Sequence, residues 1–400
     1  VKGYANVEPL PPLAVKGKAQ PISAFRVTAP GQRRSRLDQE RALSPFVGRE
    51  REGATLREAV EEVLAGRGQV VGIVGEPGVG KSRVLYELRR MLAERDVAYL
   101  EGWCQSFGHS ISYLPLQDVL RTVCGIENSD TPAQVAQRVQ AALGKLGLSP
   151  QDDAPYLLRL LGLDQGSESL IGLTPEAIQA HTLDALSRMV LARGRDRPLV
   201  VAIEDLHWID KSSEAFLGHL VESLAGTPIL LLTTSRPGYS PPWIGKSYAT
   251  QLALRVLSVE ASRRIIEATD ARSAMENTTA EAILRKAEGN PLFLEELTLA
   301  FEGHGALAAA QLLPDTIQGV LAARIDRLPE QSKRTLQTAS VLGREFPLRL
   351  LQEVSPDSTN LEVQLAALKQ LEFVYDRSAA EGPVYTFKHV LTQEVAYDSL

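Results

Sequence analysis

The chain has 400 residues, of which 44% are hydrophobic and 23% are charged, and its formal net charge is −6. This length predicts two or three domains, and the composition is typical of a soluble globular protein rather than a disordered one. The mildly negative net charge argues against a chain whose main function is to bind nucleic acid. It is still compatible with one small DNA-binding module.

Two cysteines, Cys104 and Cys124, are too far apart in the sequence for a CxxC pair. We therefore expect a reducing, cytoplasmic environment, with one disulfide as the alternative. The longest apolar runs, such as residues 229–232, fall far short of the roughly 18 residues that span a bilayer, and no signal peptide is recognisable. Because the chain begins at Val1 rather than Met and ends at Leu400 in a helical pattern, we expect a piece of a longer protein.

The first residues of the chain are rich in turn formers. Residues 1–30 alternate short apolar stretches with Pro and Gly, which predicts one or two strands with turns and no core of their own. Residues 31–44 carry many charged and few apolar side chains. We expect them to form a solvated linker.

A helix, a strand, a loop and a second helix are predicted next. Apolar residues at helical spacing from Leu56 to Leu64 indicate the first helix, and residues 84–92 indicate the second. The β-branched run 69–74 predicts a buried strand between them. After this strand comes the segment Gly75–Ser82, GEPGVGKS, which fits GxxxxGK[ST] at every fixed position.

This pattern is that of a phosphate-binding loop (P-loop), and each residue type has a physical reason. Gly75, Gly78 and Gly80 let the backbone curl so that N–H groups face the phosphates, and the next helix offers its positive N-terminus. Lys81 is expected to reach the β- and γ-phosphates, and Ser82 to bind Mg²⁺. We therefore predict binding of ATP with Mg²⁺; a plain glycine-rich turn is the alternative.

Strands continue to alternate with helices beyond this loop. Residues 97–100, 199–203 and 229–233 predict strands, residues 174–193 predict a helix, and residues 105–170 have a largely helical pattern with loops. This alternation predicts a parallel sheet with right-handed crossovers.

Two acidic residues, Glu204 and Asp205, come directly after the strand 199–203. Parallel sheets bind ligands at the carboxyl ends of their strands. One carboxylate can hold Mg²⁺ through water and the other can polarise the attacking water. We assign Glu204 to the metal and Asp205 to the water, with the reverse assignment open; a pair of acids that caps a helix is the alternative reading.

Other polar residues near these strands have two readings each. Arg236, after the strand 229–233, can touch the γ-phosphate and report hydrolysis, or it is a surface arginine. His207, Trp208 and Asp210 line the site, or they are a packed aromatic pair and a helix cap.

After about residue 257 the strand pattern stops and amphipathic helices follow, such as residues 316–328. Near the end, residues 373–375 and 384–387 predict two strands joined by a turn. Helices followed by a small hairpin suggest a winged helix over about 314–400.

Five motifs occur in order, and together they carry a family resemblance. They are Phe46-Val47-Gly48-Arg49-Glu50, the P-loop, Glu204-Asp205-Leu206-His207-Trp208, Thr234-Ser235-Arg236 and Gly289-Asn290-Pro291. Over about residues 45–400 the chain resembles the signal-transduction ATPases with numerous domains (STAND), a branch related to the AAA+ proteins. The resemblance implies an α/β P-loop NTPase sheet flanked by helices (45–256), an all-α lid (257–313) and a winged helix (314–400) that closes over the nucleotide.

The resemblance also implies further nucleotide contacts. Gly48, Arg49 and Pro291 would lie near the adenine, and His389, in Phe-Lys-His rather than the usual Met-His-Asp, would sense phosphate. From the residues alone, the alternatives are a helix-entry turn at 46–50, a helix C-terminus at 289–291 and a structural histidine at 389. The Glu-Asp order in place of the usual Asp-first pair leaves hydrolysis open. The predicted site has three parts. The catalytic residues are Glu204, Asp205 and Arg236; the metal ligands are Ser82 and Glu204; and the nucleotide-binding residues are Gly48, Arg49, Gly75, Gly78, Gly80, Lys81, Ser82, Arg83, Pro291 and His389.

The first 27 residues resemble the end of a class III nucleotide cyclase domain. Residues 10–13 and 15–27 carry the resemblance, with the Lys-Gly-x-x-x-Pro pattern of the closing strand at Lys16–Pro21. It implies a parent protein with an upstream adenylate or guanylate cyclase domain, of which residues 1–30 are the remnant. None of the cyclase's metal-binding aspartates would fall in these 400 residues.

Three functions remain to be weighed. The leading hypothesis is a nucleotide-operated switch, in which ATP and ADP stabilise different arrangements of lid and winged helix and hydrolysis is slow. Its partners are ATP, other domains of the same chain and, as an open alternative, a second copy of the chain; neither membrane nor nucleic acid is expected. The alternatives are a transcription regulator, whose winged helix or missing C-terminal domain binds DNA, and a metabolic P-loop enzyme.

Overall fold

The computed structural model describes residues 5–9, 25–30, 43–104, 112–127, 130–163, 167–269, 277–301, 316–355, 360–379 and 382–400. These residues form two compact units. The parallel-sheet unit comprises Pro45–Ile265 and Ala287–Leu292; the antiparallel-sheet unit comprises Val1–Ser44, Ile266–Lys286 and Phe293–Leu400. The cyclase-like pattern Lys16–Pro21 and most of the predicted linker lie outside the described residues.

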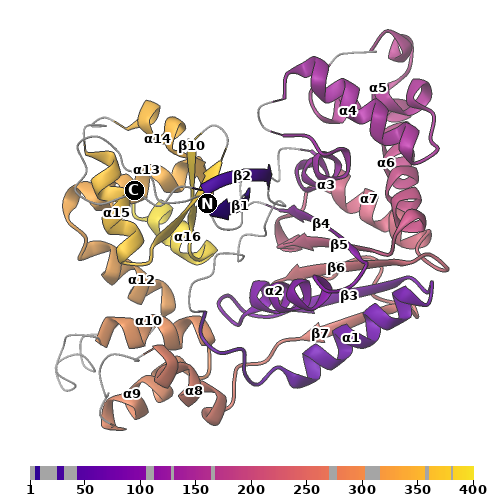
Figure 1. Ribbon diagram of the computed structural model, residues 1–400. Helices are drawn as coiled ribbons and strands as arrows, with labels where there is room; N and C mark the ends of the chain where they lie inside the picture. Colours follow the sequence, from indigo (N-terminus) through magenta and orange to yellow (C-terminus); the bar gives the residue numbers. More distant parts are fainter. Residues whose placement is uncertain are drawn as a thin grey trace. The chain divides into compact units, whose positions relative to one another are not determined.

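A five-stranded parallel sheet, of order β4-β5-β6-β3-β7, forms the centre of the parallel-sheet unit (Figure 1). The strands are β3 (Gln69–Val74), β4 (Ala98–Trp103), β5 (Leu199–Glu204), β6 (Ile229–Ser235) and β7 (Ala249–Ala253). Every residue of β5 and β6 is buried, as expected for central strands covered on both faces. The prediction of a parallel α/β sheet is confirmed.

Helices cover both faces of this sheet. On one face, α1 (Glu50–Leu64) and α2 (Lys81–Leu92) pack on side chains such as Ile73 and Leu232. On the other face, alternate residues such as Val201 and Leu231 join the core of a helical cluster, because successive strand residues point to opposite faces. That cluster is formed by α3 (Leu114–Cys124), α4 (Pro132–Lys145), α5 (Pro150–Leu160), α6 (Pro175–Asp196) and α7 (Lys211–Glu222), with short 3-10 turns η2 (Ser167–Leu170) and η3 (Leu206–Trp208).

The edge strand β7 was not predicted from the sequence. Its five residues are half-buried or exposed, so the sequence lacks both the apolar run of a central strand and clear alternation. The strand still pairs with β3, with Val74 opposite Ala253. The helix α8 (Val259–Thr269) follows and begins in this unit.

The antiparallel-sheet unit is mainly helical and contains a three-stranded sheet of order β8-β10-β9. The strands are β8 (Glu345–Pro347), β9 (Val374–Ala379) and β10 (Gly382–Phe387). The helices are α9 (Asn277–Ala287), α10 (Pro291–Phe301), α12 (Ile317–Asp326), α13 (Glu330–Leu342), α14 (Leu348–Val354), α15 (Leu361–Gln370) and α16 (Val390–Asp398). Helices with a small terminal hairpin were predicted, and this part of the fold is confirmed; β8 is an addition.

Two further observations complete the fold. Strands β1 (Ala5–Pro9) and β2 (Phe25–Pro30) form an antiparallel pair with a register shift. Within the part of the chain that the structure describes, no helix combines the length and apolarity needed to cross a membrane. The residue boundaries of the predicted domains stay predictions.

Candidate functional site

The P-loop connects the carboxyl end of β3 to the amino end of α2. Gly78 and Gly80 have φ angles of 80° and 104°, a left-handed conformation that costs free energy for residues with a side chain. The Lys81 ammonium donates hydrogen bonds to the carbonyl oxygens of Gly75 (2.8 Å) and Glu76 (3.1 Å). The loop thus curls around the lysine at a helix N-terminus, which is the geometry of an anion-binding site.

Both oxygens of the Glu204 carboxylate accept a hydrogen bond. Ser82 Oγ donates to Oε2 at 2.7 Å, and the indole nitrogen of Trp103 donates to Oε1 at 3.0 Å. Glu204 is only 6% exposed. Since hydroxyl and carboxylate oxygens are the ligands that Mg²⁺ prefers, Ser82 and Glu204 fit the metal-binding role predicted for them.

Trp103 was missed by sequence reasoning. It is the last residue of β4, and the register of the sheet places it opposite Glu204, the last residue of β5. The pairing of β4 with β5 brings these two residues together. The sequence predicts both strands but not the register between them.

Asp205 has a backbone conformation unlike that of its neighbour. Its φ is 61°, left-handed and costly for a residue other than glycine. Its backbone N–H donates to Thr234 Oγ1 at 2.9 Å, and Thr234 is 1% exposed on the adjacent strand β6. Glu204 is the last residue of β5 and Asp205 is left-handed, so the two acids differ in backbone conformation. The difference supports different roles for the two acids.

The charge of Lys81 is influenced by several predicted site residues. Burial lowers the pKa of Lys81, with Arg236 acting in the same direction, whereas the nearby acids Asp205, Glu76 and Glu204 raise it. The structure therefore brings Lys81, Arg236 and the acid pair within electrostatic reach of one another. This grouping follows from three adjacent strands ending at one edge of the sheet.

Arg236 lies over an aromatic ring rather than standing free at the surface. Its guanidinium carbon is 4.9 Å from the ring centre of Trp208, a cation–π contact, and the Trp208 ring is 4.4 Å from that of His207. Asp210 caps α7 by accepting a hydrogen bond from Ser213 N at 2.9 Å. For Asp210, then, the structure shows the helix-cap alternative.

The two residues expected beside the adenine contact protein groups. A Cβ at Gly48 would lie 3.1 Å from Ala261 Cβ, so this glycine packs closely on α8. The Arg49 side chain is buried, donates to the carbonyl oxygen of Val79 at 2.9 Å and pairs with Glu52 at 3.2 Å. Arg49 thus contacts the P-loop backbone, and its role beside the adenine stays a prediction.

The segment Gly289–Leu292 contacts the P-loop through two hydrogen bonds. The Asn290 amide donates to the carbonyl oxygen of Pro77 at 2.9 Å, and Leu292 N donates to that of Gly78 at 3.3 Å. Pro291 is the first residue of α10. Sequence reasoning identified the motif but not the contacts of Asn290.

Two predicted residues have other surroundings. Arg83 pairs with Glu87 at 2.9 Å, and its guanidinium lies 5.6 Å from the ring centre of Phe46. His389 belongs to the antiparallel-sheet unit, at the N-cap of α16. Burial, with Lys388 and nearby arginines, holds its pKa well below the ordinary value. Its predicted contact with phosphate stays a prediction.

Comparisons with known proteins agree with this geometry. Residues 45–232 match the family model for an AAA ATPase domain. The chain is 32% identical over 375 residues to an uncharacterised protein of Rhizobium meliloti, an alignment that covers 89% of this chain and 35% of that protein. It therefore spans about a third of the length of this relative.

Among solved structures, the chain is similar to a STAND protein with a tetratricopeptide repeat sensor from Pyrococcus horikoshii. The TM-score is 0.50 at 16% identity, and the match covers 89% of this chain and 44% of that one. At this identity the likeness concerns the fold alone. The chain thus contains an AAA-type ATPase domain, and its fold resembles that of a STAND ATPase. Such a domain suggests the binding and hydrolysis of ATP.

Proposed function

We propose that this chain is the ATP-binding regulatory switch of a multidomain signalling protein and that it hydrolyses ATP slowly. The observation that carries the proposal is the P-loop joined to Glu204 through the Ser82 hydroxyl, at 2.7 Å, inside the AAA ATPase domain. These are the groups that bind a nucleoside triphosphate and its metal ion.

In the proposed site each residue has one task. The backbone N–H groups of the loop and Lys81 bind the phosphates, and Ser82 with Glu204 would hold Mg²⁺. When bound, the metal ion would neutralise negative charge that develops on the phosphates. Asp205 would orient the attacking water, and Arg236 would contact the γ-phosphate. Hydrolysis is slow in this proposal because a switch needs a long-lived ATP state.

The signalling role rests on the likeness to STAND proteins. In the proposal, ATP and ADP favour different arrangements of the predicted lid and winged helix, and this difference passes to neighbouring domains. The parent protein would be cytoplasmic and carry a class III cyclase domain upstream of Val1. The proposed cyclase domain rests on the Lys16–Pro21 pattern. The sequence that precedes Val1 in the parent protein would test it.

Calorimetric titration of the full chain with ATP and Mg²⁺ tests the central claim. We expect the native chain to bind ATP and Lys81→Ala to bind it at least 100-fold more weakly, because the ammonium that faces the phosphates is lost. Equal affinities for the two proteins would contradict the assignment of the P-loop. A steady release of phosphate by the native chain would show hydrolysis.

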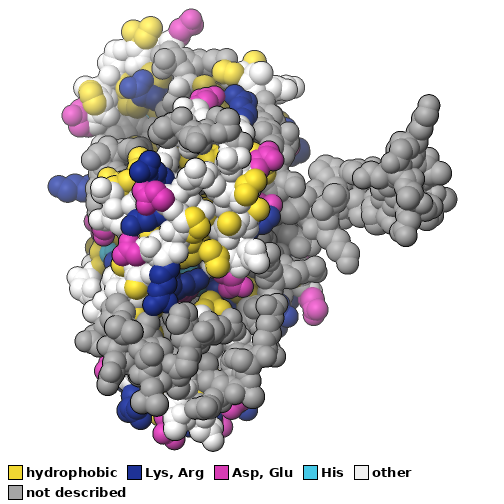
Figure 2. All heavy atoms as spheres, turned by 90° about the vertical axis from the view of Figure 1, so that its left-hand side faces the viewer, with side chains coloured by type: hydrophobic (Ala, Val, Ile, Leu, Met, Phe, Trp, Pro, Cys, Tyr) yellow, Lys and Arg dark blue, Asp and Glu magenta, His cyan; other side chains and the backbone are white. Residues whose placement is uncertain are grey.

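A DNA-binding regulator is the second candidate, favoured by the helices and three-stranded sheet of the antiparallel-sheet unit. The net charge of −6 counts against it. In the face shown in Figure 2, basic and acidic side chains are intermingled among the described residues. A salt-dependent mobility shift of duplex DNA by the full chain would support this candidate.

A further inference from the structure

Three consecutive carbonyl groups of the P-loop, those of residues 77–79, accept hydrogen bonds from outside the loop. Asn290 Nδ2 donates to the first at 2.9 Å, Leu292 N to the second at 3.3 Å and Arg49 Nη2 to the third at 2.9 Å. The donors come from two segments, one before and one after the loop: Arg49 is 30 residues from its acceptor in the sequence, and Asn290 is 213 residues from its own. All of them belong to the parallel-sheet unit.

These contacts determine where the loop's N–H groups point. In a planar trans peptide the C=O of one residue and the N–H of the next point in opposite directions. Holding the carbonyl groups of residues 77 and 79 on their donors therefore turns the N–H groups of residues 78 and 80 the opposite way, whereas the N–H of Val79 donates to the carbonyl oxygen of Glu76 at 3.3 Å. Successive N–H groups that converge on one point form an anion-binding nest.

Asn290 packs closely against the P-loop at Gly78. A Cβ at Gly78 would lie 2.7 Å from Asn290 Oδ1 and 3.0 Å from Leu292 Cβ, so the amide lies directly against the loop. Glu288 and Gly289 are both left-handed, with φ of 48° and 77°. These two residues turn the chain after α9 and so bring Asn290 to the loop.

The segment that carries Asn290 is itself anchored. Gly289 O accepts a hydrogen bond from Leu257 N at 2.8 Å, and a Cβ at Gly289 would lie 2.4 Å from Leu257 O. On the other side, Arg49 is 6% exposed, and Glu52 holds its second terminal nitrogen. Both donors are therefore fixed before any ligand arrives.

We propose that Asn290 and Arg49 are positioning residues of the P-loop, which hold its N–H groups ready for a polyphosphate. The proposal rests on the proposed function, because it concerns the same nucleotide site. In this proposal both residues act on the phosphates through the backbone of residues 77–79, which for Arg49 is a role other than the predicted one beside the adenine. Because α10 begins at Pro291, the same contacts tie the loop to the first turn of that helix.

Two variants and two matched controls test this proposal. Asn290→Ala removes the amide donor, and Arg49→Lys removes the guanidinium while it keeps the charge. The control for the first is Gln117→Ala, since Gln117 Nε2 donates to the carbonyl oxygen of Leu160 at 2.9 Å in the same unit.

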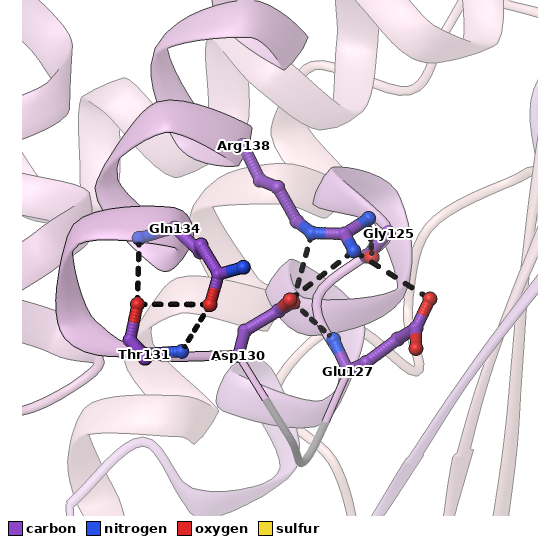
Figure 3. Close-up of polar contacts among 6 residues, drawn as sticks. All are labelled: Gly125, Glu127, Asp130, Thr131, Gln134 and Arg138. Carbon is purple, nitrogen blue, oxygen red and sulfur yellow. Dashed lines mark hydrogen bonds and ion pairs between the residues drawn. The ribbon is translucent and has the colours of Figure 1, made fainter. Parts of the chain in front are cut away.

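The control for the second variant is Arg138→Lys. Arg138 Nη1 donates to the carbonyl oxygen of Gly125 at 2.7 Å, and its guanidinium is paired with Asp130 at 2.8 Å (Figure 3). Like Arg49, it joins a backbone carbonyl to a carboxylate. It does so between α3 and α4, remote in the fold from the P-loop.

Affinities of the full chain for ATP and for inorganic tripolyphosphate, both with Mg²⁺, are measured by calorimetry. Tripolyphosphate has the phosphates without base or ribose. We expect each of Asn290→Ala and Arg49→Lys to weaken the binding of both ligands by about 10-fold, the effect of one lost hydrogen bond. Both controls should bind ATP and tripolyphosphate within about 2-fold of the native chain.

Three other results would overturn the proposal. Weaker ATP binding with unchanged tripolyphosphate binding would place Asn290 and Arg49 against the base. Equal losses in variants and controls would indicate a general effect on the fold, and unchanged affinities would exclude positioning. Failure of the native chain to bind either ligand, or native affinity in Lys81→Ala, would instead refute the proposed function, which separates the two failures.

Discussion

The P-loop and the start of α16 were both predicted to contact nucleotide, yet they differ in how their polar groups are satisfied. In the P-loop, the lysine and three backbone carbonyls have partners within the loop or in neighbouring segments. At His389, which is half-buried, the ring atom Nε2 is inaccessible and has no hydrogen-bond partner within the described residues. The prediction for the P-loop therefore rests on several positions with a geometric reason, whereas the phosphate contact of His389 rests on one residue in an altered motif, and both stay predictions.

The largest effect should come from the glycine that lets Asn290 approach the loop. Gly78→Ala places a Cβ 2.7 Å from Asn290 Oδ1 on a backbone with φ of 80°, so the loop must shift. We expect ATP affinity to fall more than 100-fold in calorimetry. Gly144→Ala, in α4 with no atom within 4 Å of the added Cβ, is the control and should bind ATP normally. Normal binding by Gly78→Ala would show that the loop tolerates a different shape.

Next in size is the effect of neutralising the buried acid. Glu204→Gln keeps the shape of the side chain but removes the charge that would hold Mg²⁺ beside Ser82. We expect ATP turnover to fall about 100-fold while ATP still binds, since the loop contacts are intact. Phosphate release and calorimetry measure the two effects. A raised Mg²⁺ requirement in Asp205→Asn but not in Glu204→Gln would favour the reverse assignment of the two acids.

Trp103 offers a finer test of the same carboxylate. Trp103→Phe keeps a ring at the end of β4 but removes the N–H that donates to Glu204 Oε1. With one oxygen released, the carboxylate is less well oriented, so we expect kcat to fall roughly 30-fold with little change in KM. The Mg²⁺ concentration for half-maximal turnover should rise as well. A variant that loses thermal stability but keeps its Mg²⁺ dependence would make Trp103 only a packing residue.

The sequence predicts those parts of the fold that depend on local pattern. Strands β3, β5 and β6 follow from apolar runs, and the loop Gly75–Ser82 follows from glycine positions that the backbone requires. The edge strand β7 has no such pattern, because its residues are half-buried or exposed. It forms through pairing with β3.

The same limit applies to the site. Lys81, Ser82 and Glu204 could be predicted because the chemistry demands those residue types after a strand. Trp103, Asn290 and the contact of Arg49 depend on sheet register and on segments that meet only in the folded chain. Contacts of this kind cannot be predicted from a local pattern in a single sequence.

The smallest expected effect concerns His389, whose protonation should make the stability of the chain depend on pH. Burial, together with Lys388, Arg344 and Arg324, keeps its folded-state pKa well below the ordinary value of 6.5. Because the unfolded chain takes up the proton more readily, stability is fully present above about pH 6.5 and is lost as the pH falls below it. The loss approaches about 1.4 kcal/mol per pH unit. Urea unfolding at pH 7.5 and 5.5 should therefore show a smaller difference for His389→Leu than for the native chain.

His219→Leu, which alters an exposed position of α7, is the matched control and should keep the pH dependence of the native chain. If His389→Leu also keeps it, the acid sensitivity arises from other groups, and the buried imidazole is not the source. If the variant loses it, the imidazole is neutral in the folded chain, as its burial among cations requires. A neutral imidazole adds no positive charge for a phosphate, so this result would also separate His389 from Lys81 as a type of anion-binding group.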